Sequence, residues 1–584
     1  MNYSGTALNE RTQRVASSAL LWIVLGLLVI VPVVTFLLTA FSPRMFHLGP
    51  QWISFHSFRE AFQGSTGQGI ADSLWVSSAV GLCASAAATA LAWLVQRTNM
   101  RGSRFISGLM WVQLLIPTWM MTIGWTNLIM PGEVASAFGF NTTRLYHLFY
   151  GPVGIMLILT TAALPFCYFV VSAGLRGLGS EFEDAVRVHG GSTVRVLRTV
   201  LPIIAPAIMS AFVIAFAESI SDFGVAFTLG LNDHFPMATF TLFNAITQNP
   251  ANFSVAAVIA GVLILCTVPP IFLQSKITRG RSYAVLGGRA RPIRRHQFSG
   301  VTRNLVTFAV FSVLIALIII PLVASLATSF THTISFETVT GVHWSLASYR
   351  QVFSPPPSIM SMGAGLALSN HLGLYVATGT VILSYVLATR LARTSGGLSQ
   401  RITDVFLLGS IAIPGVVLGV GYILFYNQGF IANHVMSLYQ TMPLLAMGLM
   451  ASAVPGQSRL LVGPVSQLQS SMIDAARVHG AARFRAWCST ALPILSRTLT
   501  WAWVLTFTKT ISELAVAQML VVPDHEPISV ILETTLGTVF APIGVAATVL
   551  VLGEMLGIIG LVLLAYRVVA PRGWRRIGTI GELS

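Results

Sequence analysis

Charged residues are scarce in this sequence. Of its 584 residues only 9% are charged and 54% are hydrophobic, and the mean hydropathy is +0.76. A soluble domain usually carries about 25% charged residues. The composition therefore excludes an ordinary soluble protein and indicates a chain that crosses a lipid bilayer several times.

Lysine is rarer still, because Lys276 and Lys509 are the only two in the chain. A phosphate-binding P-loop needs a glycine and a lysine followed by serine or threonine. Neither lysine follows a glycine. The chain therefore cannot supply its own ATPase, and any ATP-driven work needs a partner that binds ATP and magnesium.

Cysteine and catalytic motifs are also missing or few. The four cysteines, at positions 83, 167, 266 and 488, have no paired spacing, so they imply neither a disulfide nor a metal site. No Ser–His–Asp set and no HExxH motif appears. We therefore expect no catalytic residues, no metal ligands and no cofactor in this chain, and a membrane-embedded enzyme is disfavoured.

Long apolar runs are abundant instead. They fall at 18–41, 71–95, 105–130, 151–175, 201–227, 253–274, 305–330, 366–389, 403–427, 440–460, 492–517 and 541–566. Backbone groups in hydrocarbon must bond to one another, so runs of this length predict helices. The first run lacks a small-residue cleavage pattern and is expected to stay as a helix. The fold class expected is all-α, with about twelve transmembrane helices.

The basic residues predict the orientation of these helices. The net charge is +15, and 28 of the 34 lysines and arginines lie in alternate connections, in the 275–304 segment and at the two ends. Such an excess marks the cytoplasmic side, so both termini are expected in the cytoplasm. Because the basic residues do not line one face, nucleic acid is not an expected partner.

The sequence repeats itself at a separation of 290 or 291 residues. The matches are Pro165 with Pro455, DAVRVHGGS (184–192) with DAARVHGAA (474–482), SFREAF (57–62) with SYRQVF (348–353), Leu201-Pro202 with Leu492-Pro493, Ser221-Asp222 with Ser512-Glu513 and Pro236 with Pro527. We predict a first half at 1–274, a basic cytosolic linker at 275–304 and a second half at 305–584. Six helices per half predict a pseudo-two-fold axis along the membrane normal, with the cargo site between the halves.

The repeated nine residues are too polar for a span and lie on the predicted cytosolic side. Each copy reads as a short amphipathic stretch, a glycine that permits a sharp turn (Gly190, Gly480), a second polar stretch and a proline (Pro202, Pro493) in the first turn of the next membrane helix. This predicts a helix–turn–helix on the membrane surface. A single copy would more often be a solvated loop, but two equivalent copies favour a coupling element.

DAARVHGAARFRAWCSTALP (474–493) resembles the "EAA" loop of permeases in binding-protein-dependent ABC importers. Asp474, Ala475, Ala476, Gly480 and Pro493 fit that pattern, with Asp in place of the usual Glu. The first copy is similar through Asp184, Ala185, Gly190 and Pro202, although Val186 replaces the second alanine and the spacing from glycine to proline is one residue shorter. The resemblance implies that both loops dock on a dimer of a cytosolic ABC ATPase.

Further stretches resemble the fused ferric-iron and thiamine permeases of this superfamily: ISDFGVAFTLG (220–230), FPMATFTLFNAI (235–246) and FSVAAV (253–258). This resemblance implies a bacterial inner-membrane permease that takes a small polar solute or metal ion from a periplasmic binding protein. Ferric iron is the favoured cargo, and thiamine, polyamine and 2-aminoethylphosphonate stay open.

Four charged residues fall inside the predicted membrane region at matching places. Glu218 and Asp222 are expected to share a face of the fifth helix of the first half, and Lys509 and Glu513 are their counterparts. Buried charges in a membrane usually face protein or water. They are therefore candidates for the translocation path, with a Glu218–Lys509 pair as one arrangement and a structural ion pair between the halves as the alternative. Their net charge of −2 favours a cation. Glu554, alone on the last helix, receives no role.

Two alternatives accompany this interpretation. His189 and His479 recur at matching positions, but they lie in separate halves without further ligands, so contact with the ATPase is favoured over metal binding. Twelve helices in two halves also describe secondary transporters driven by an ion gradient. Such a transporter has no reason to keep the repeated cytosolic loop.

Overall fold

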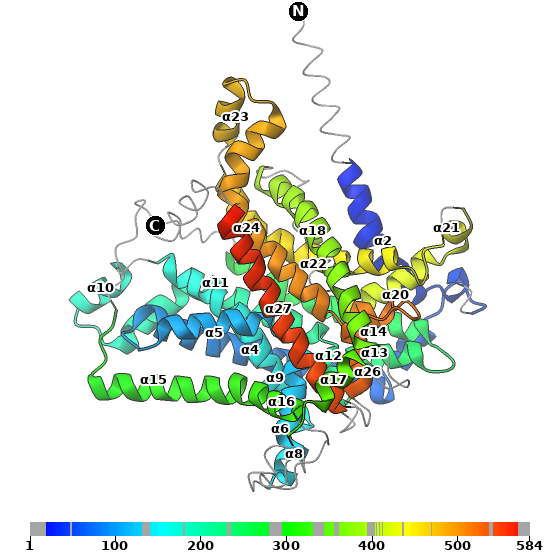
Figure 1. Ribbon diagram of the computed structural model, residues 1–584, viewed down its shortest axis with the longest axis horizontal. Helices are drawn as coiled ribbons and strands as arrows, with labels where there is room; N and C mark the ends of the chain where they lie inside the picture. Colours follow the sequence, from blue (N-terminus) through cyan, green and yellow to red (C-terminus); the bar gives the residue numbers. More distant parts are fainter. Residues whose placement is uncertain are drawn as a thin grey trace, which may run out of the picture.

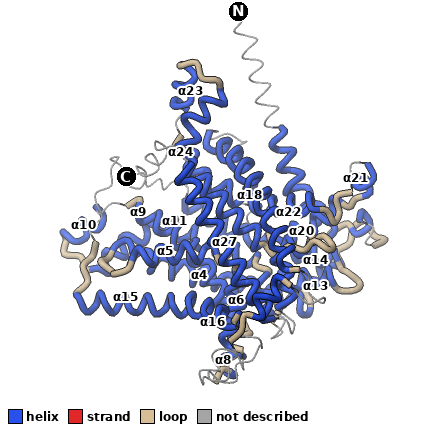
Figure 2. The backbone as a smooth tube through the Cα atoms, in the orientation of Figure 1, coloured by secondary structure: helices blue, strands red, loops and turns tan. Residues whose placement is uncertain are grey.

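The computed structural model describes residues 19–46, 49–130, 141–178, 181–230, 235–278, 295–330, 344–354, 361–393, 403, 406–407, 409–410, 413–434, 437–468, 470–536 and 541–569. Within these ranges the regular structure is helical, with no β-strand (Figure 1, Figure 2). The predicted all-α class is confirmed. Most of the predicted linker, residues 279–294, lies outside the described part.

The first half begins with the helix at 19–39, which contains η1 (Gly26–Ile30) and α2 (Val31–Thr39). It continues through η2 (Pro43–Phe46), α3 (His56–Ala61), α4 (Gly64–Arg97), α5 (Ser103–Leu115), α6 (Thr118–Ile129), α8 (Thr143–Phe149), α9 (Pro152–Arg176), α10 (Glu181–Val188), α11 (Thr193–Ser221), α12 (Gly224–Gly230), α13 (Ala238–Thr247) and α14 (Phe253–Thr278).

The second half starts with α15 (Gly300–Leu314), η3 (Ile315–Ile319) and α16 (Ile320–Ser329), which form one continuous helix. It continues through α17 (Ala347–Phe353), α18 (Met362–Arg393), α20 (Gly415–Tyr426), α21 (Gly429–His434), α22 (Met442–Ser466), α23 (Ser470–Val478), α24 (Arg483–Ser512), α25 (Ala515–Met519), α26 (Ile528–Leu536) and α27 (Ala541–Val569).

Eight helices in the described residues are long and apolar enough to cross a membrane. The predicted helix at 105–130 is wrong as a single helix, because α5 and α6 meet at an angle of 101°. Pro117 explains the break: a residue before proline avoids helical geometry, and Ile116 is extended (φ −86°, ψ 120°). The helices α22 and α24 have the length of spans but are not among the eight, and α20 has 12 residues. The number twelve therefore stays a prediction.

The two halves use the same element order and the same contacts. The helices α4, α9 and α11 pack together in the first half, as α18, α22 and α24 do in the second. The Ser73 hydroxyl accepts a bond from the Ala238 N–H (2.7 Å), and the Ser369 hydroxyl accepts one from the Ile528 N–H (2.9 Å). Each bond ties a long helix, α4 or α18, to the start of a short helix, α13 or α26. The axis relating the halves stays a prediction.

The first helix of each half packs against the other half. The helix α2 lies against α20, and α16 lies against α6. Glycines make both close approaches possible: a Cβ at Gly421 would lie 2.6 Å from the Pro32 carbonyl oxygen, and a Cβ at Gly124 would lie 2.6 Å from the Pro321 carbonyl oxygen. Each half is therefore held by a helix of its neighbour.

Proline shapes both crossing helices. A π-helical segment precedes Pro32 and another precedes Pro321, since proline lacks the N–H that would complete the α-helical pattern. In the first helix the carbonyl of Leu28 loses its α-helical partner at Pro32. The buried Tyr422 hydroxyl from the second half donates to that carbonyl (2.7 Å). The carbonyl whose α-helical partner is missing in the first half is therefore hydrogen-bonded by a side chain of the second half.

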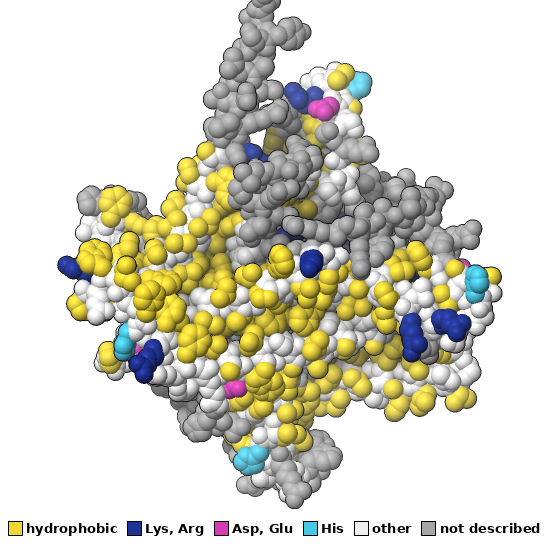
Figure 3. Space-filling model, turned by 180° about the vertical axis from the view of Figure 1, so that it is seen from behind, with side chains coloured by type: hydrophobic (Ala, Val, Ile, Leu, Met, Phe, Trp, Pro, Cys, Tyr) yellow, Lys and Arg dark blue, Asp and Glu magenta, His cyan; other side chains and the backbone are white. Residues whose placement is uncertain are grey.

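The surface of the molecule is suited to lipid. Figure 3 shows apolar side chains over the broad middle of the face it displays.

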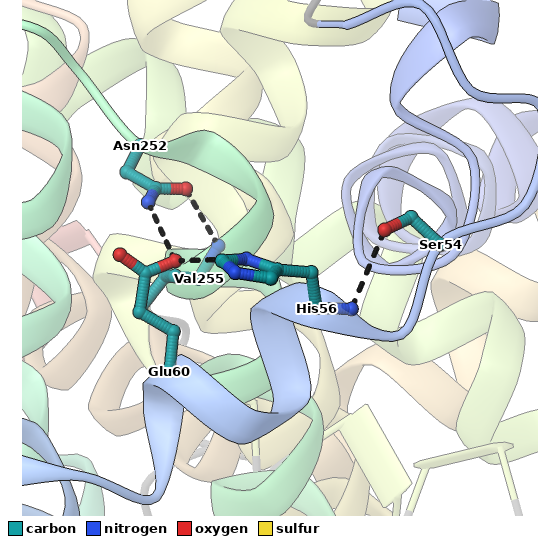
Figure 4. A network of polar contacts seen from close by, with 5 residues as sticks. All are labelled: Ser54, His56, Glu60, Asn252 and Val255. Atoms are coloured by element: carbon teal, nitrogen blue, oxygen red, sulfur yellow. Dashed lines mark hydrogen bonds and ion pairs between the residues drawn. The ribbon is translucent and has the colours of Figure 1, made fainter.

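A small polar network joins the start of α14 to α3. The Asn252 amide donates to Glu60 (3.4 Å), and its carbonyl oxygen accepts from the Val255 N–H (3.1 Å) (Figure 4). His56 lies 3.7 Å from the same Glu60 carboxylate.

Candidate functional site: a charged cavity between the halves and two surface elbows

A cavity of about 390 Å³ lies where the two halves meet. Its walls come from α5, α6, α9 and α11 of the first half and from α20, α22 and α24 of the second. All four charged residues singled out in the sequence line it: Glu218, Asp222, Lys509 and Glu513. The structure therefore brings these four residues together; their role in transport stays a prediction.

The expected helical placement of two of them is wrong. The helix α11 ends at Ser221, and Asp222 follows it in an extended conformation (φ −66°, ψ 129°). Glu513 likewise follows α24 (φ −71°, ψ 115°). Each carboxylate therefore lies at a break, between α11 and α12 or between α24 and α25, instead of sharing a helical face with its partner four residues earlier.

These breaks have the same local cause in both halves. The Asp222 carboxylate accepts the Val225 N–H (2.8 Å), and the Glu513 carboxylate accepts the Val516 N–H (3.5 Å). An acidic side chain that satisfies the first N–H groups of the next helix competes with continuation of the previous one. The Thr239 hydroxyl donates to the Asp222 carbonyl (2.8 Å), and Ser529 does the same for Glu513 (2.9 Å).

The proposed pair of Glu218 and Lys509 is not a direct contact. Both side chains line the cavity, and Lys509 interacts electrostatically with Glu218 and Glu513, yet among the described side chains no ion pair joins Glu218 to Lys509. The cavity wall therefore carries three carboxylates and one ammonium group, a formal charge of −2.

Sequence reasoning missed three residues of the first half that face this cavity. The Thr118 hydroxyl donates to Asp222 (3.0 Å), and the Trp119 indole donates to the Ser512 carbonyl of the second half (3.1 Å). Gln113 is 1% exposed, and its amide has no hydrogen-bonding partner among the described residues. The signal that could have found them is Ile116-Pro117, which recurs as Ile413-Pro414 and marks a helix break at the cavity in both halves.

No group of three histidine, cysteine, aspartate or glutamate side chains in the described residues is close enough to hold a metal ion. Glu554, which had no partner in the sequence, lies next to Asn370 of α18, whose amide donates to its carboxylate (2.5 Å). Both lie outside the cavity.

The two repeated loops fold as predicted up to the turn. We name residues 181–202 the first elbow and residues 470–493 the second elbow. Gly190 (φ 73°) and Gly480 (φ 85°) take the left-handed conformation that the turn requires. In the first elbow the N–H groups of Gly190 and Gly191 donate to the carbonyls of Arg187 and Val186 (both 2.9 Å), the pattern that closes a helix end with a glycine.

The expected place of the two prolines is wrong. Pro202 and Pro493 lie inside α11 and α24, which begin at Thr193 and Arg483 and run without interruption into the protein core. A proline inside a helix removes one hydrogen bond, and here the helix continues through that loss. The second arm of each elbow and the span behind it are consequently one helix.

The predicted docking residues are at the surface. Ala185, Gly190, Asp474, Ala475 and Gly480 are exposed. Asp184 and Ala476 are partly exposed. The two repeated histidines, His189 and His479, are also exposed, one in each elbow.

Comparison with known proteins identifies the class. Residues 84–277, which include α9, the first elbow and the Glu218–Asp222 wall of the cavity, match the family described as "Binding-protein-dependent transport system inner membrane component". This third of the chain is therefore similar to the permease domain of that family. The predicted resemblance to ABC importer permeases is therefore confirmed.

Relatives extend the match along the permease. A Haemophilus influenzae protein whose name assigns it to ferric transport, FbpB 1, is 21% identical over 467 residues, covering 78% of this chain and 70% of the relative. The molybdenum transport system permease protein ModB of Escherichia coli K12 is 26% identical over 199 residues (32% and 82%). The sulfate transport system permease protein CysT of Salmonella typhimurium is 23% identical over 198 residues (32% and 69%). The names of all three relatives describe permease proteins of transport systems.

Proposed function

We propose that this permease is the membrane-spanning subunit of an ATP-driven importer that carries a cation, with ferric iron as the favoured cargo. The observation that carries the proposal is the cavity between the halves, with three carboxylates and one ammonium group in its wall. The net negative charge of the wall attracts and stabilises a cation in the cavity, whereas it repels an anion such as sulfate. The net charge of this cavity therefore favours a ferric cargo, as in the name of the ferric-transport relative, over sulfate.

The energy is proposed to arrive through the two elbows. Each elbow exposes a short helix to solvent and continues as a single helix, α11 or α24, to the acidic break at the cavity. A cytosolic ATPase dimer that grips Asp184, Ala185 and Gly190 in one half and Asp474, Ala475, Ala476 and Gly480 in the other would move both cavity walls together. Pro202 and Pro493 lie within these connecting helices.

The remaining parts of the proposal rest on the family match and on the distribution of the basic residues. A periplasmic binding protein delivers the cargo, the permease lies in a bacterial inner membrane, and both termini face the cytoplasm. The cycle alternates access as the halves move about the cavity. Thiamine, polyamine and 2-aminoethylphosphonate are the other cargoes to test.

The cargo is tested by uptake into proteoliposomes that contain the permease with its ATPase and binding protein. Ferric iron, thiamine, a polyamine, 2-aminoethylphosphonate and sulfate are supplied separately, each as a radiolabelled compound. We expect ATP-dependent uptake of the ferric form and none of sulfate. Sulfate uptake with no ferric uptake would contradict the cation proposal.

Coupling is tested by cysteine cross-linking in a chain whose four native cysteines are replaced. A single cysteine at Ala475, which is exposed on α23, is expected to cross-link to the ATPase. A cysteine at the exposed Phe55, in the connection before α3, is the control. Equal cross-linking at both positions, or at Phe55 alone, would contradict docking at the elbow.

A further inference from the structure

Arg97 forms a junction that none of the functions above uses. It is the last residue of α4, and only 1% of it is exposed. One of its terminal nitrogens donates to the carbonyls of Leu175 (2.7 Å) and Leu178 (2.8 Å), at the end of α9 and just beyond it. Carbonyls at a helix C-terminus carry partial negative charge and favour a cation. Arg97 therefore fastens the ends of α4 and α9 together.

The same guanidinium group also holds the first elbow. Its Nε lies 3.2 Å from the carboxylate of Glu183 on α10, and Glu183 is only 3% exposed. Burial raises the pKa of the Glu183 carboxyl, while the neighbouring Arg97 and Arg187 guanidinium groups act against that rise. A charged pair this far from water is stable only while both partners are in place.

Among the described residues, α23 of the second elbow has no equivalent anchor, although the second arm of this elbow is tied to α18 through Trp487, whose indole donates to the Tyr385 hydroxyl (2.6 Å). Arg393 occupies the place in α18 that matches Arg97, at the same separation of 296 that relates Ser73 to Ser369. The place that matches Glu183, however, is held by Ile473. None of the α23 side chains that the structure describes is buried, and the Asp474–Arg477 pair (3.8 Å) is exposed. In Figure 1, α23 projects from the top of the molecule and α10 lies at its left edge; α23 contacts α24 as α10 contacts α11.

We propose that Arg97 and Glu183 clamp the first elbow to the ends of α4 and α9, so that the two elbows are mechanically unequal. The helix α10 of the first elbow then acts on three helices, α4, α9 and α11, whereas α23 of the second elbow acts through α24. Arg97 and Glu183 are positioning residues: they touch neither cargo nor ATP, and they determine whether a displacement of α10 also moves α4 and α9. The consequence for transport rests on the proposed coupling to an ATPase, but the clamp itself does not.

The clamp is tested first on the permease alone. Hydrogen exchange is measured by mass spectrometry in lipid nanodiscs for the peptides that cover α10 and α23. We expect α10 to exchange about 10- to 100-fold more slowly than α23, because local opening must break a buried ion pair. Glu183→Gln is expected to remove that difference by accelerating α10 and leaving α23 unchanged. Equal exchange in the two unmodified elbows would overturn the proposal.

Two further variants keep the test decisive if Glu183→Gln fails to fold. Ile473→Glu adds a carboxylate at the sequence position that matches Glu183, in the half where Arg393 matches Arg97, and is expected to slow exchange in α23 while α10 stays the same. Arg187→Gln removes the outer partner of Glu183, which is 3.9 Å away and 32% exposed, and is expected to leave α10 protected. Unchanged exchange after Ile473→Glu, or loss of protection in Arg187→Gln equal to that in Glu183→Gln, would refute the clamp.

The transport consequence is measured with the ATPase and binding protein present. Glu183→Gln is expected to lower the number of cargo molecules imported per ATP hydrolysed at least twofold at an unchanged rate of hydrolysis, which a general loss of folded protein would not do. An unchanged ratio would overturn the positioning role. If the exchange experiment shows the clamp but no ATPase drives transport, the proposed function fails and the clamp stands.

Discussion

Lys509 is the position where a single substitution tests the cation proposal most sharply. It supplies the only positive charge among the four charged residues of the cavity wall. Lys509→Met keeps an unbranched side chain but changes the formal charge of the wall from −2 to −3. Glu218→Gln changes it in the opposite direction, to −1. The two variants are expected to shift the apparent affinity for cargo in opposite directions.

The size of the effect follows from the size of the cavity. A sphere of 390 Å³ has a radius of about 4.5 Å, so an ion at its centre lies about 5 Å from a charge in the wall. One unit charge at that distance contributes about 0.8 kcal/mol in water and about 3.3 kcal/mol at an effective dielectric constant of about 20. For each unit of cargo charge, Lys509→Met should therefore lower the KM by about 4-fold to about 250-fold.

The assay is the initial rate of ATP-dependent uptake into proteoliposomes as a function of cargo concentration. Ser452→Ala, a neutral change in the same wall, is the control. Glu218→Gln should raise the KM by a similar factor. A KM that moves the same way in both charge variants, or not at all while expression is normal, would refute the electrostatic reasoning. Full transport and expression in Lys509→Glu would likewise count against any role for this charge.

Three other perturbations have clear expected outcomes. Gly421→Ala and Gly124→Ala each place a methyl group against a carbonyl oxygen of the opposite half and should destabilise the protein by about 1–3 kcal/mol in thermal unfolding, whereas Gly108→Ala, which meets nothing within 4 Å, should not; equal unfolding midpoints would argue against the crossed first helices. Gly480→Ala imposes a left-handed conformation on alanine at a cost of about 1–2 kcal/mol and should reduce ATP-dependent uptake while the protein still folds and is expressed; uptake at the normal rate would contradict a role for this turn in coupling. Glu554→Gln keeps a side chain that can accept the Asn370 amide and should preserve the expression level, whereas Glu554→Leu should lower it, as measured by fluorescence of a fused reporter; the reverse order would be incompatible with the Asn370 contact.

The sequence predicts the apolar helices and the meeting of the four charges for separate reasons. Long apolar runs indicate helices because the backbone must satisfy itself in lipid. Glu218 and Lys509 occupy matching places in a repeat, so a shared interface between the halves was expected, and the structure places them in one cavity. Gly190 and Gly480 were expected at sharp turns because only glycine takes a left-handed conformation without cost, and both have positive φ.

The helix ends near the cavity could not be obtained from hydropathy. Asp222 and Glu513 stand in apolar surroundings that favour one long helix, and the helices stop there because each carboxylate binds the N–H groups of the next helix. At Pro202 the error is the opposite one. Proline favours the first turn of a helix, so a helix start is predicted there, but α11 begins at Thr193 and continues past Pro202. The Arg97–Glu183 pair joins residues 86 positions apart, and no local pattern indicates it.

The most direct test of the central claim compares two energy sources in the same vesicles. Right-side-out proteoliposomes that contain the permease, its ATPase and its binding protein receive ferric cargo outside, with either ATP inside or an imposed proton gradient and no ATP. The account predicts uptake with ATP alone, lost when α23 is replaced by a flexible linker. Uptake driven by the proton gradient without ATP would contradict it and identify a secondary transporter.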